Sequence, residues 1–521
     1  MSGGALQRDP LRIGVVIDDV GDLSICVRRV LEAICKDERF RLAAVFSADA
    51  KKSRAGLVFA IATAAESAVF SRRRNIPTPC FDAAVTELTI ENLSVVSEPV
   101  QRLDVIIDFL DAPLAVQLAS TARFGLWRLS SNDAVAGFFE TLNRAPVTEV
   151  SLLQYANKSD LPREIARAAY NTKFVASRNT AFVREKASQL IMCELARIWL
   201  HSAPADNGPV PAAPPRKPGV PDLAAYGVRL TAALFDRIGK KVRAKAGLRP
   251  GMFMLRYGPG GPDEFDPAKG VDIVPSGDQY WADPFLFRYG GATYVFFENY
   301  EYATRRGHIS VGRIEGNHFE FIGTAIAADY HLSYPFVFEH DGEIYMMPET
   351  SQARRIEVWR LEKFPDQWEL HATVLDGEVT ADSVLYKDGE ASWLFTNKTN
   401  DSYGDHNSEL HLYNVDGPSL RKLEPHPLNP VVIDAQSARG GGRVFQHNGR
   451  LLRASQNNSH GIYGYGLNLM EICRLDMLDY KEKVFRRIEP DFDRDLIGCH
   501  HVDFLDGYYI IDLRKKRGGR A

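Results

Sequence analysis

The carboxyl-terminal half of the sequence repeats one pattern five times. Each copy is an apolar run, a tight turn that contains glycine and a second apolar run, as in Asp283-Pro-Phe-Leu-Phe followed by Tyr294-Val-Phe-Phe-Glu298. The copies open at Asp283, Tyr334, Asp382, Gly441 and His501. Asp-Gly or Asn-Gly between such runs favours a β-hairpin, and repeats of this length are typical of propeller blades. The pattern therefore predicts an all-β five-bladed propeller over residues 248–521.

The same repeat predicts a ring of polar side chains. In the first four copies a polar residue closes the second run, 15 residues after the opening residue: Glu298, Glu349, Asn397 and Gln456. In a propeller the opening and closing positions face the axial funnel, so we expect a shared polar pocket there. The neighbouring residues that extend it are Trp281, His331, Arg439, Arg443, His460, Asn468 and His500. The alternative is that these groups hydrogen-bond the blades to one another and line a wet channel.

The amino-terminal part alternates between strand-like and helix-like segments. Leu11–Ile17, Phe40–Phe46, Leu103–Phe109 and Phe124–Leu129 are apolar runs, and helical periodicity is found at residues 25–34 and 112–123. This alternation predicts an α/β domain with a parallel sheet over residues 10–200. A ligand is expected at the carboxyl ends of the strands, near Asp18, Asp108 and residues 130–133, although these residues can equally end strands and cap helices.

Residues 201–247 separate the two predicted domains. Seven prolines between Pro204 and Pro221 indicate an extended linker. A basic amphipathic helix is expected from Tyr226 to Lys245, with Leu230, Ala233, Leu234 and Ile238 on one side. We expect this helix to pack on the propeller, and attachment to a membrane surface is the alternative.

The composition limits the class of protein. At 521 residues two or three domains are expected, and 45% apolar and 25% charged residues are typical of a soluble globular chain. A net charge of −4 does not indicate a nucleic-acid partner. The six cysteines are scattered without metal-binding spacing, and the start lacks an apolar targeting segment, so a cytoplasmic protein without a cofactor or metal is expected.

The amino-terminal domain resembles the formyltransferase-like proteins. The resemblance rests on Gly125-Leu-Trp and on Gly137-Phe-Phe-Glu-Thr-Leu-Asn. That family uses an Asn, a His and an Asp around a formyl group donated by formyl-tetrahydrofolate. Here no histidine occurs before His201. The resemblance therefore implies a Rossmann-type fold with a degenerate site, of which Asn132 and Asp160 are the candidate remnants.

The propeller resembles the five-bladed arabinanase-like and family-43 glycoside hydrolases at Trp281-Ala-Asp283 and Ala381-Asp382. The resemblance implies Asp283 as general base and Asp382 as the residue that tunes the acid. The family's catalytic Glu is replaced by Ala438-Arg-Gly-Gly-Gly-Arg443, so Glu349 is the candidate substitute.

A second resemblance covers residues 275–512. Tyr334-Pro-Phe-Val-Phe, Met347-Pro-Glu-Thr350 and Phe364-Pro-Asp-Gln-Trp368 are similar to the amino-terminal domain of plant glucosamine inositolphosphorylceramide transferases, which also occurs in bacterial proteins. In the plant enzymes a separate glycosyltransferase domain follows the propeller.

These observations predict a bacterial carbohydrate-binding or carbohydrate-processing protein of glycan or glycolipid biosynthesis. A sugar, sugar nucleotide or glycolipid head group would bind in the funnel, held by carboxylates and by Trp281 or Tyr334. The alternatives are a non-catalytic scaffold for a glycan-assembly enzyme, a glycoside hydrolase that uses Asp283 and Asp382, and a sugar N-formyltransferase. No nucleic acid and no transmembrane segment are expected, and peripheral membrane contact stays open.

Overall fold

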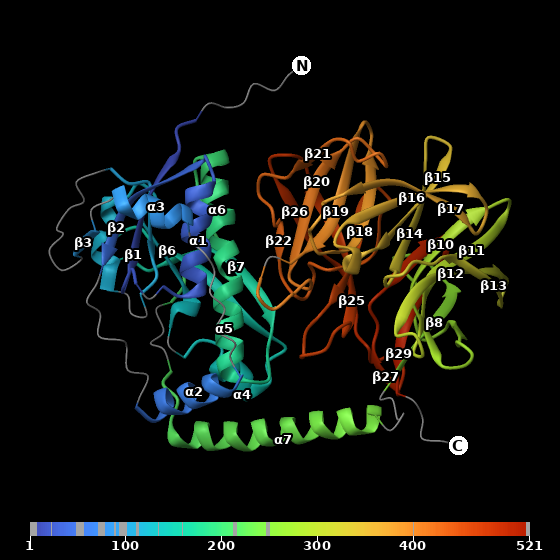
Figure 1. Cartoon of the computed structure of the whole chain (residues 1–521), viewed down its shortest axis with the longest axis horizontal. Helices are drawn as coiled ribbons and strands as arrows, with labels where there is room; N and C mark the ends of the chain where they lie inside the picture. Colours follow the sequence, from blue (N-terminus) through green and yellow to red (C-terminus); the bar gives the residue numbers. More distant parts are fainter. Residues whose placement is uncertain are drawn as a thin grey trace. The chain divides into compact units, whose positions relative to one another are not determined.

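The computed structural model describes residues 8–21, 23–47, 57–70, 79–87, 90–92, 102–110, 114–133, 135–158, 160–211, 216–245, 251–399 and 401–516. The chain divides into two compact units (Figure 1). The first comprises residues 1–235 with 401–403, and the second comprises residues 236–400 with 404–521. Each unit has apolar cores of its own.

A seven-stranded sheet forms the centre of the first unit, in the order β3-β2-β1-β4-β5-β6-β7. The strands from β3 to β5 pair in parallel, as the alternation of strands and helices predicted. The strands are β1 (Leu11–Ile17), β2 (Phe40–Ser47), β3 (Ile90–Asn92), β4 (Val105–Asp108), β5 (Leu126–Leu129), β6 (Val147–Tyr155) and β7 (Arg163–Asn171).

The expectation of a wholly parallel sheet is wrong at one edge, where β6 is antiparallel to both β5 and β7. Residues 156–162 join β6 to β7. A connection this short joins antiparallel neighbours, because a parallel pair needs a crossover of a dozen or more residues. Val147-Thr-Glu-Val-Ser-Leu alternates in burial, which is the pattern of a half-exposed strand. The sheet is therefore mixed.

Helices and 3-10 turns complete the first unit. α1 begins after Ser24, whose hydroxyl accepts a hydrogen bond from the Val27 amide, and it buries Val30 and Leu31. Of the helix predicted over residues 112–123, the described part is a 3-10 helix, η1 (Leu114–Thr121). The remaining elements are α1 (Ile25–Lys36), α2 (Leu57–Phe70), α3 (Pro79–Glu87), η2 (Ser130–Asn132), α4 (Phe138–Asn143), α5 (Ala176–Lys186) and α6 (Ser188–His201).

The helix α7 (Val220–Lys245) is longer than the predicted segment and begins six residues before Tyr226. Tyr226 donates a hydrogen bond to Glu66 and packs against the ring of Phe138. The prediction that Ile238 shares one face with Leu230 is wrong, because Ile238 is 57% exposed whereas Leu230 is half-buried. Among the described residues, the helices include none that is long and apolar enough to cross a membrane.

Part of the proline-rich segment is bound to the first unit. The amide of Glu164 donates to the carbonyl of Gly208 at 2.9 Å, and the amide of Val210 donates to Pro162 at 2.8 Å. Residues 207–210 therefore lie along β7 instead of forming a free spacer.

The second unit is built of five antiparallel sheets, which confirms the predicted five-bladed propeller. The first three blades are β10-β11-β12-β13, β14-β15-β16-β17 and β18-β19-β20-β21, and the fourth is β23-β24-β25-β26. Their strands are β10 (Gln279–Tyr289), β11 (Ala292–Glu301), β12 (Arg306–Glu315), β13 (His318–Ile326), β14 (Ser333–His340), β15 (Glu343–Glu349), β16 (Ile356–Lys363), β17 (Gln367–Val374), β18 (Thr380–Asp388), β19 (Ala391–Lys398), β20 (Glu409–Val415), β21 (Leu423–Pro425), β22 (Val432–Ile433), β23 (Gly440–His447), β24 (Arg450–Asn457), β25 (Gly466–Leu475) and β26 (Tyr480–Ile488).

The fifth blade joins the two ends of the propeller. Its order is β27-β29-β8-β9, with β28 also paired to β29, so strands from residues 252–273 complete a sheet that ends at residue 515. These strands are β8 (Met252–Pro259), β9 (Val271–Ile273), β27 (Leu496–Gly498), β28 (Val502–Leu505) and β29 (Tyr508–Lys515). Pairing of β8 with β29 closes the ring, because strands from both ends of the propeller share one sheet.

A local irregularity recurs at the start of the innermost strands. Pairing is interrupted after Ala282, Ser333 and Ala381, and the next residue has positive φ in each case: Asp283 (52°), Tyr334 (49°) and Asp382 (49°). A non-glycine residue held in this region re-aims its side chain and is characteristic of bulges next to functional sites. The repeat in the sequence is therefore a repeat of one backbone bend.

The fourth blade differs by one residue. Its interruption runs from Gly440 to Val444, and Gly440 pairs with Ser455. In the first blade, by contrast, Ala282 pairs with Glu298. The register thus places Ser455, one residue before the predicted Gln456, at the closing position. Glycine is required here, because a Cβ on Gly442 (φ 146°) would lie 2.2 Å from the Val502 carbonyl oxygen.

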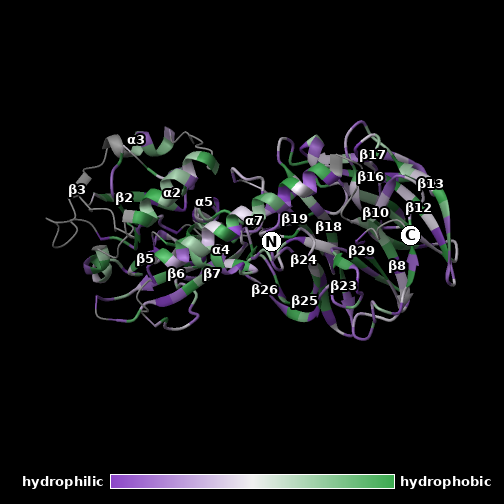
Figure 2. Ribbon diagram, turned by 90° about the horizontal axis from the view of Figure 1, so that it is seen from below, coloured by the Kyte–Doolittle hydropathy of each residue, from purple (hydrophilic) through white to green (hydrophobic). Residues whose placement is uncertain are grey.

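Apolar side chains between the blades form the cores of the propeller. One cluster includes Phe296, Phe336 and Phe395, from three successive blades. Figure 2 shows hydrophobic and hydrophilic residues interspersed along the blade strands, as expected for strands with an inner and an outer face.

Candidate functional site

A cavity of about 140 Å³ lies where the five blades converge. Its lining comes from every blade: Phe253, Tyr280, Ala282, Asp283, Glu298, His331, Ser333, Glu349, Asp382, Arg439, Tyr463 and His500. Asp283 and Asp382 lie at the recurrent bends and have positive φ, and Ala282 and Ser333 directly precede a bend. We call this cavity the axial pocket.

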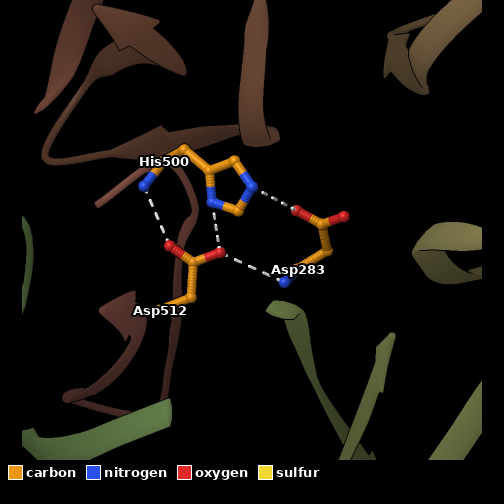
Figure 3. A group of neighbouring side chains, drawn as sticks. All are labelled: Asp283, His500 and Asp512. Carbon is orange, nitrogen blue, oxygen red and sulfur yellow. Dashed lines mark hydrogen bonds and ion pairs between the residues drawn. The ribbon is translucent and has the colours of Figure 1, made fainter. Parts of the chain in front are cut away.

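His500, which lines the axial pocket, lies between the carboxylates of Asp283 and Asp512 (Figure 3). Its Nδ1 lies 2.5 Å from Asp512 Oδ2, and its Nε2 lies 3.7 Å from Asp283 Oδ1. The backbone amides of His500 and His501 donate to Asp512 at 2.8 and 3.0 Å, and the Asp283 amide donates at 3.2 Å. Asp512 thus orients the imidazole, whose other nitrogen faces Asp283.

The same three side chains could coordinate a cation. Asp283, His500 and Asp512 each offer one ligand atom, and these atoms lie within 4.8 Å of one another. Oxygen and imidazole ligands suit several divalent metals. The sequence spacing did not predict this cluster, because Asp283 is more than 200 residues away from His500 and Asp512 in the chain.

Burial dominates the electrostatics of the carboxyl groups. It raises the pKa of Asp283 to about 7, although His500 acts in the opposite direction. It also raises the pKa of Asp382 to about 6 against the effect of Arg439, and that of Glu298 well above its ordinary value. Carboxyl groups with separated pKa values are the arrangement that supports acid and base roles in one site.

The pKa values of His500 and Asp512 are shifted so that both groups favour their charged forms. Burial disfavours the imidazolium, yet the Asp512 carboxylate raises the pKa of His500 above its ordinary value. Burial likewise opposes ionisation of Asp512, and the neighbouring His500 lowers the pKa of that carboxyl group. His500 and Asp512 are therefore an ion pair, whereas Asp283 retains a proton up to near neutral pH.

Arg439 joins two further carboxylates of the axial pocket. Its Nε donates to Asp382 Oδ2 at 2.6 Å, and its Nη2 lies 3.5 Å from Glu349 Oε2. The guanidinium lies over the ring of Tyr463, 4.9 Å from the centroid. Arg439 is thus a cation positioned to donate to a ligand while it holds Asp382 and Glu349.

Aromatic rings form the remaining wall. The hydroxyl of Tyr280 donates to Glu298 at 3.1 Å, and its ring stacks on Tyr300 at 4.7 Å. Phe253 stacks on the imidazole of His500 at 4.7 Å. The axial pocket therefore combines hydrogen-bonding oxygens with apolar ring faces, which is the usual composition of a small-molecule site.

Most of the predicted carboxylates meet in this pocket. Seven predicted residues line it: Asp283, Glu298, His331, Glu349, Asp382, Arg439 and His500. Three other predicted residues contact the lining residues. His501 lies 3.8 Å from Asp283, the amide of Tyr334 donates to the Asp283 carboxylate, and Gln456 donates to Asp382 at 3.0 Å.

Five further predicted side chains do not line the pocket. Trp281 packs among Phe297, Phe319 and Phe321 and is not part of the pocket lining. The structure assigns packing and inter-blade contacts to these residues: Trp281, Asn397, Arg443, His460 and Asn468.

Two of these residues tie blades to one another. Asn397 donates to the carbonyl of Ala438 and accepts from the amide of Gly440, which joins the third blade to the fourth. Arg443 binds Asp503 of the fifth blade and the carbonyl of Leu286 of the first. The alternative that polar residues link the blades is thus realised at these positions.

Six contributors were not predicted: Phe253, Tyr280, Ala282, Ser333, Tyr463 and Asp512. Asp512 had a signal, because it closes the fifth copy of the repeat as Glu298 closes the first. Tyr280 precedes the first bend, and Tyr463 lies in a glycine-rich loop. Phe253 had no local signal, since it reaches the pocket only through pairing of β8 with β29.

The first unit has a smaller cavity of about 120 Å³ at the carboxyl ends of β1 and β4, where a ligand was expected. Asp18 and Asn132 line it. Asp108 is buried and forms an ion pair with Arg128 at 3.0 Å; burial raises the pKa of Asp108 to about 6. Asp160 does not line this cavity, and its carboxylate accepts a hydrogen bond from Asn157 in the loop that joins β6 to β7. Asn132 and Asp160, the candidate remnants of a formyltransferase site, are therefore not brought together in this cavity.

The comparisons with known proteins concern the second unit. Residues 271–493 match one family model. Its description is "Glucosamine inositolphosphorylceramide transferase 1, N-terminal". A curated protein with the name glucosamine inositolphosphorylceramide transferase 1, from Oryza sativa subsp. japonica, is 37% identical over 205 residues, and its counterpart from Arabidopsis thaliana is 32% identical over 207 residues. The resemblance predicted for the propeller is thereby confirmed.

The match is partial on both sides. It covers 39% of this chain and 27% of each of these two relatives. The chain therefore spans about a quarter of the length of the curated relatives that it matches. The resemblance of the first unit to formyltransferases remains a prediction, because the matched family segment contains none of the strands β1 to β7.

Solved structures with some likeness to this chain include glycoside hydrolases. A family 117 glycoside hydrolase of Zobellia galactanivorans has a TM-score of 0.33 at 12% identity and covers 51% of this chain and 91% of its own. The GH43_1 enzyme from Xanthomonas citri has a TM-score of 0.34 at 14% identity and covers 46% and 86%. The assignment of five blades depends only on the five antiparallel sheets of this chain and not on these solved structures.

Proposed function

We propose that the axial pocket binds a sugar or the sugar head group of a glycolipid, and that the chain acts in glycan or glycolipid assembly. The observation that carries this proposal is the convergence of four carboxyl groups, one guanidinium and aromatic rings from all five blades. Carboxylates accept hydrogen bonds from sugar hydroxyls, Arg439 donates to ring or glycosidic oxygens, and ring faces pack against C–H groups.

The size of the pocket favours a small ligand. Pockets that enclose drug-sized molecules measure roughly 300–1,000 Å³, whereas the axial pocket measures about 140 Å³. A single sugar ring or head group is therefore the preferred occupant over an oligosaccharide. The names of the curated relatives, which specify a glucosamine and inositolphosphorylceramide transferase, support a glycolipid-related role.

Glycosyl chemistry is the second candidate, since the pocket holds protonated and ionised carboxyl groups together. Asp283 would act as the proton carrier, and Asp382 or Glu349 as the charged partner. The remaining candidate is a scaffold that binds a glycan-assembly enzyme without binding sugar. A location in the cytoplasm is part of the proposal, as the sequence predicted.

The test is binding of the full chain to monosaccharides, sugar nucleotides and glycolipid head groups, measured by calorimetry. Glu349→Gln is the site variant, because it retains shape and removes one acceptor charge of the pocket. Glu343→Gln is the matched control, since Glu343 lies on the same strand and is exposed. We expect at least a tenfold loss of affinity in Glu349→Gln and none in Glu343→Gln.

Equal affinity of both variants and the wild-type chain would place the ligand elsewhere. Failure of every ligand to bind would refute the sugar site and favour the scaffold. Any ligand that binds is then incubated with the chain, and release or transfer of sugar that is lost in Asp283→Asn distinguishes catalysis from binding alone.

A further inference from the structure

The helix α7 carries an exposed apolar face. Val228, Phe235, Ile238 and Val242 are 72%, 71%, 57% and 60% exposed. Val228, Phe235 and Val242 are spaced by seven residues, two helical turns, so they lie on one side of the helix, and Ile238 falls beside them. We call these four residues the α7 stripe. Figure 2, a view from below, shows hydrophobic and hydrophilic residues alternating along α7.

The α7 stripe is distinct from the face by which α7 packs in the first unit. Leu223 and Tyr226 pack against the cluster of Phe59, Phe138 and Leu142. The Tyr226 hydroxyl also accepts a hydrogen bond from the Ala176 amide at 2.8 Å. With 3.6 residues per turn, these anchoring residues lie about 100–180° around the helix from Val228, Phe235 and Val242. The stripe is therefore a second apolar face, turned to solvent.

The charges beside the α7 stripe are mostly positive. The helix contains six Lys or Arg residues against two Asp residues, whereas the whole chain has a net charge of −4. Its basic side chains whose exposure the structure describes all lie at the surface: Arg229, Arg237, Lys240, Lys241 and Arg243. Asp236 is already paired with Lys240, at 2.7 Å. Positive charge and exposed apolar groups thus coincide on one helix of an acidic protein.

We propose that α7 binds the surface of an anionic membrane, with the α7 stripe inserted among the lipid head groups and the basic residues in contact with lipid phosphates. A basic helix with a separate apolar face is the form that lies in the interface plane of a bilayer. Anionic lipid complements the cationic flanks. A second copy of α7 is the less favoured occupant, because pairing two stripes would bring the cations of both helices together.

This surface is independent of the proposed sugar site. It would hold the protein at the bilayer, where a glycolipid head group or a membrane-bound assembly enzyme is found. The helix is not long and apolar enough to span the bilayer. The attachment is therefore peripheral and reversible.

The test is co-sedimentation of the full chain with vesicles. One set contains phosphatidylcholine alone, and the other contains phosphatidylcholine and phosphatidylglycerol in equal amounts. We expect binding to the anionic vesicles at low salt, at least tenfold weaker binding to the neutral ones, and loss of binding when salt is raised. Equal binding to both sets, or no binding to the anionic set, would overturn the proposal.

Two variants locate the contact. Val228→Ser with Val242→Ser removes apolar groups from the α7 stripe, and Val58→Ser with Val69→Ser is the matched control on α2, where these valines are 60% and 74% exposed. We expect at least a tenfold loss of vesicle binding in the first pair only. Wild-type binding by that pair would refute the role of the stripe.

A charge variant and two further controls complete the test. Lys241→Gln with Arg243→Gln keeps the apolar face and should weaken binding to anionic vesicles severalfold, and unchanged binding contradicts the charge argument. Asp283→Asn should bind vesicles as the wild-type chain does, which separates this surface from the sugar site. Concentration-dependent dimers that disappear in the stripe variant, without vesicle binding, would show that a second copy covers the stripe.

Discussion

Asp283→Asn tests whether the axial pocket holds a buried carboxyl group in its protonated form. The replacement retains an oxygen that can accept the hydrogen bond from the Tyr334 amide, and Asn tolerates the positive φ of 52° at this position. The replacement removes the ionisable carboxyl group of residue Asp283. The charged groups that face Asp283 are His500, Asp512, Asp382, Arg439 and Glu298.

The magnitude follows from the pKa of Asp283. A rise from 3.8 to about 7 means that the folded chain binds a proton that the unfolded chain has released between these pH values. This contribution to stability is fully present below about pH 4 and is lost as the pH rises through about 7. The full shift corresponds to roughly 4 kcal/mol. Because Glu298 and Asp512 respond to removal of the neighbouring charge, we expect a measured change of about 1–4 kcal/mol.

The assay is urea unfolding of the full chain from about pH 5 to about pH 8, with wild type and Asp283→Asn compared at each pH. The difference in the free energy of unfolding, variant minus wild type, should rise with pH, so that the variant is the more stable protein at the alkaline end. Asp388→Asn, an exposed Asp that ends a strand of the third blade, should show no pH-dependent difference. A difference for Asp283→Asn that stays constant or falls with pH would refute the buried, protonated carboxyl group.

Three further predictions concern the propeller. Glu482→Ala removes the partner of Arg453, whose side chain is 1% exposed and lies 2.7 Å from the Glu482 carboxylate. This variant should lower the free energy of unfolding in urea by about 3–5 kcal/mol, and replacement of both residues by apolar ones should recover most of the loss. A smaller effect in the single variant would contradict the buried ion pair. Gly442→Ala should destabilise by more than about 1 kcal/mol, because its Cβ would meet the Val502 carbonyl oxygen, and a calorimetric transition at the wild-type temperature would show that the blade bend tolerates a side chain. Arg439→Met should weaken binding of any sugar identified in the panel at least tenfold, with undiminished affinity as the outcome that excludes Arg439 from the site.

Much of the propeller could be predicted because its signals are local. Alternating apolar runs and tight turns such as Asp341-Gly342 specify hairpins through the backbone preferences of a few neighbouring residues. The five copies specify the number of blades, and all five are found. The antiparallel edge of the first unit was missed although its signal was also local, in the alternating pattern of Val147–Tyr155.

The composition of the axial pocket could be predicted only in part. The carboxylates at the opening and closing positions, such as Asp283 and Glu349, follow from the repeat, because equivalent positions in each blade point the same way. Trp281 was placed in the funnel by the sequence, but a residue near a bend can face either the funnel or the space between blades. Only packing against Phe297 and Phe319 settles its position.

The sequence by itself determined the blades and the kinds of side chain at the ends of their inner strands. The tertiary structure alone decided which of these side chains meet. Phe253 and His500 become neighbours because β8 closes the ring against β29, a contact between residues about half the chain apart. The tertiary structure also decided the protonation of Asp283, because desolvation depends on all the atoms that surround a carboxyl group and not on its neighbours in sequence.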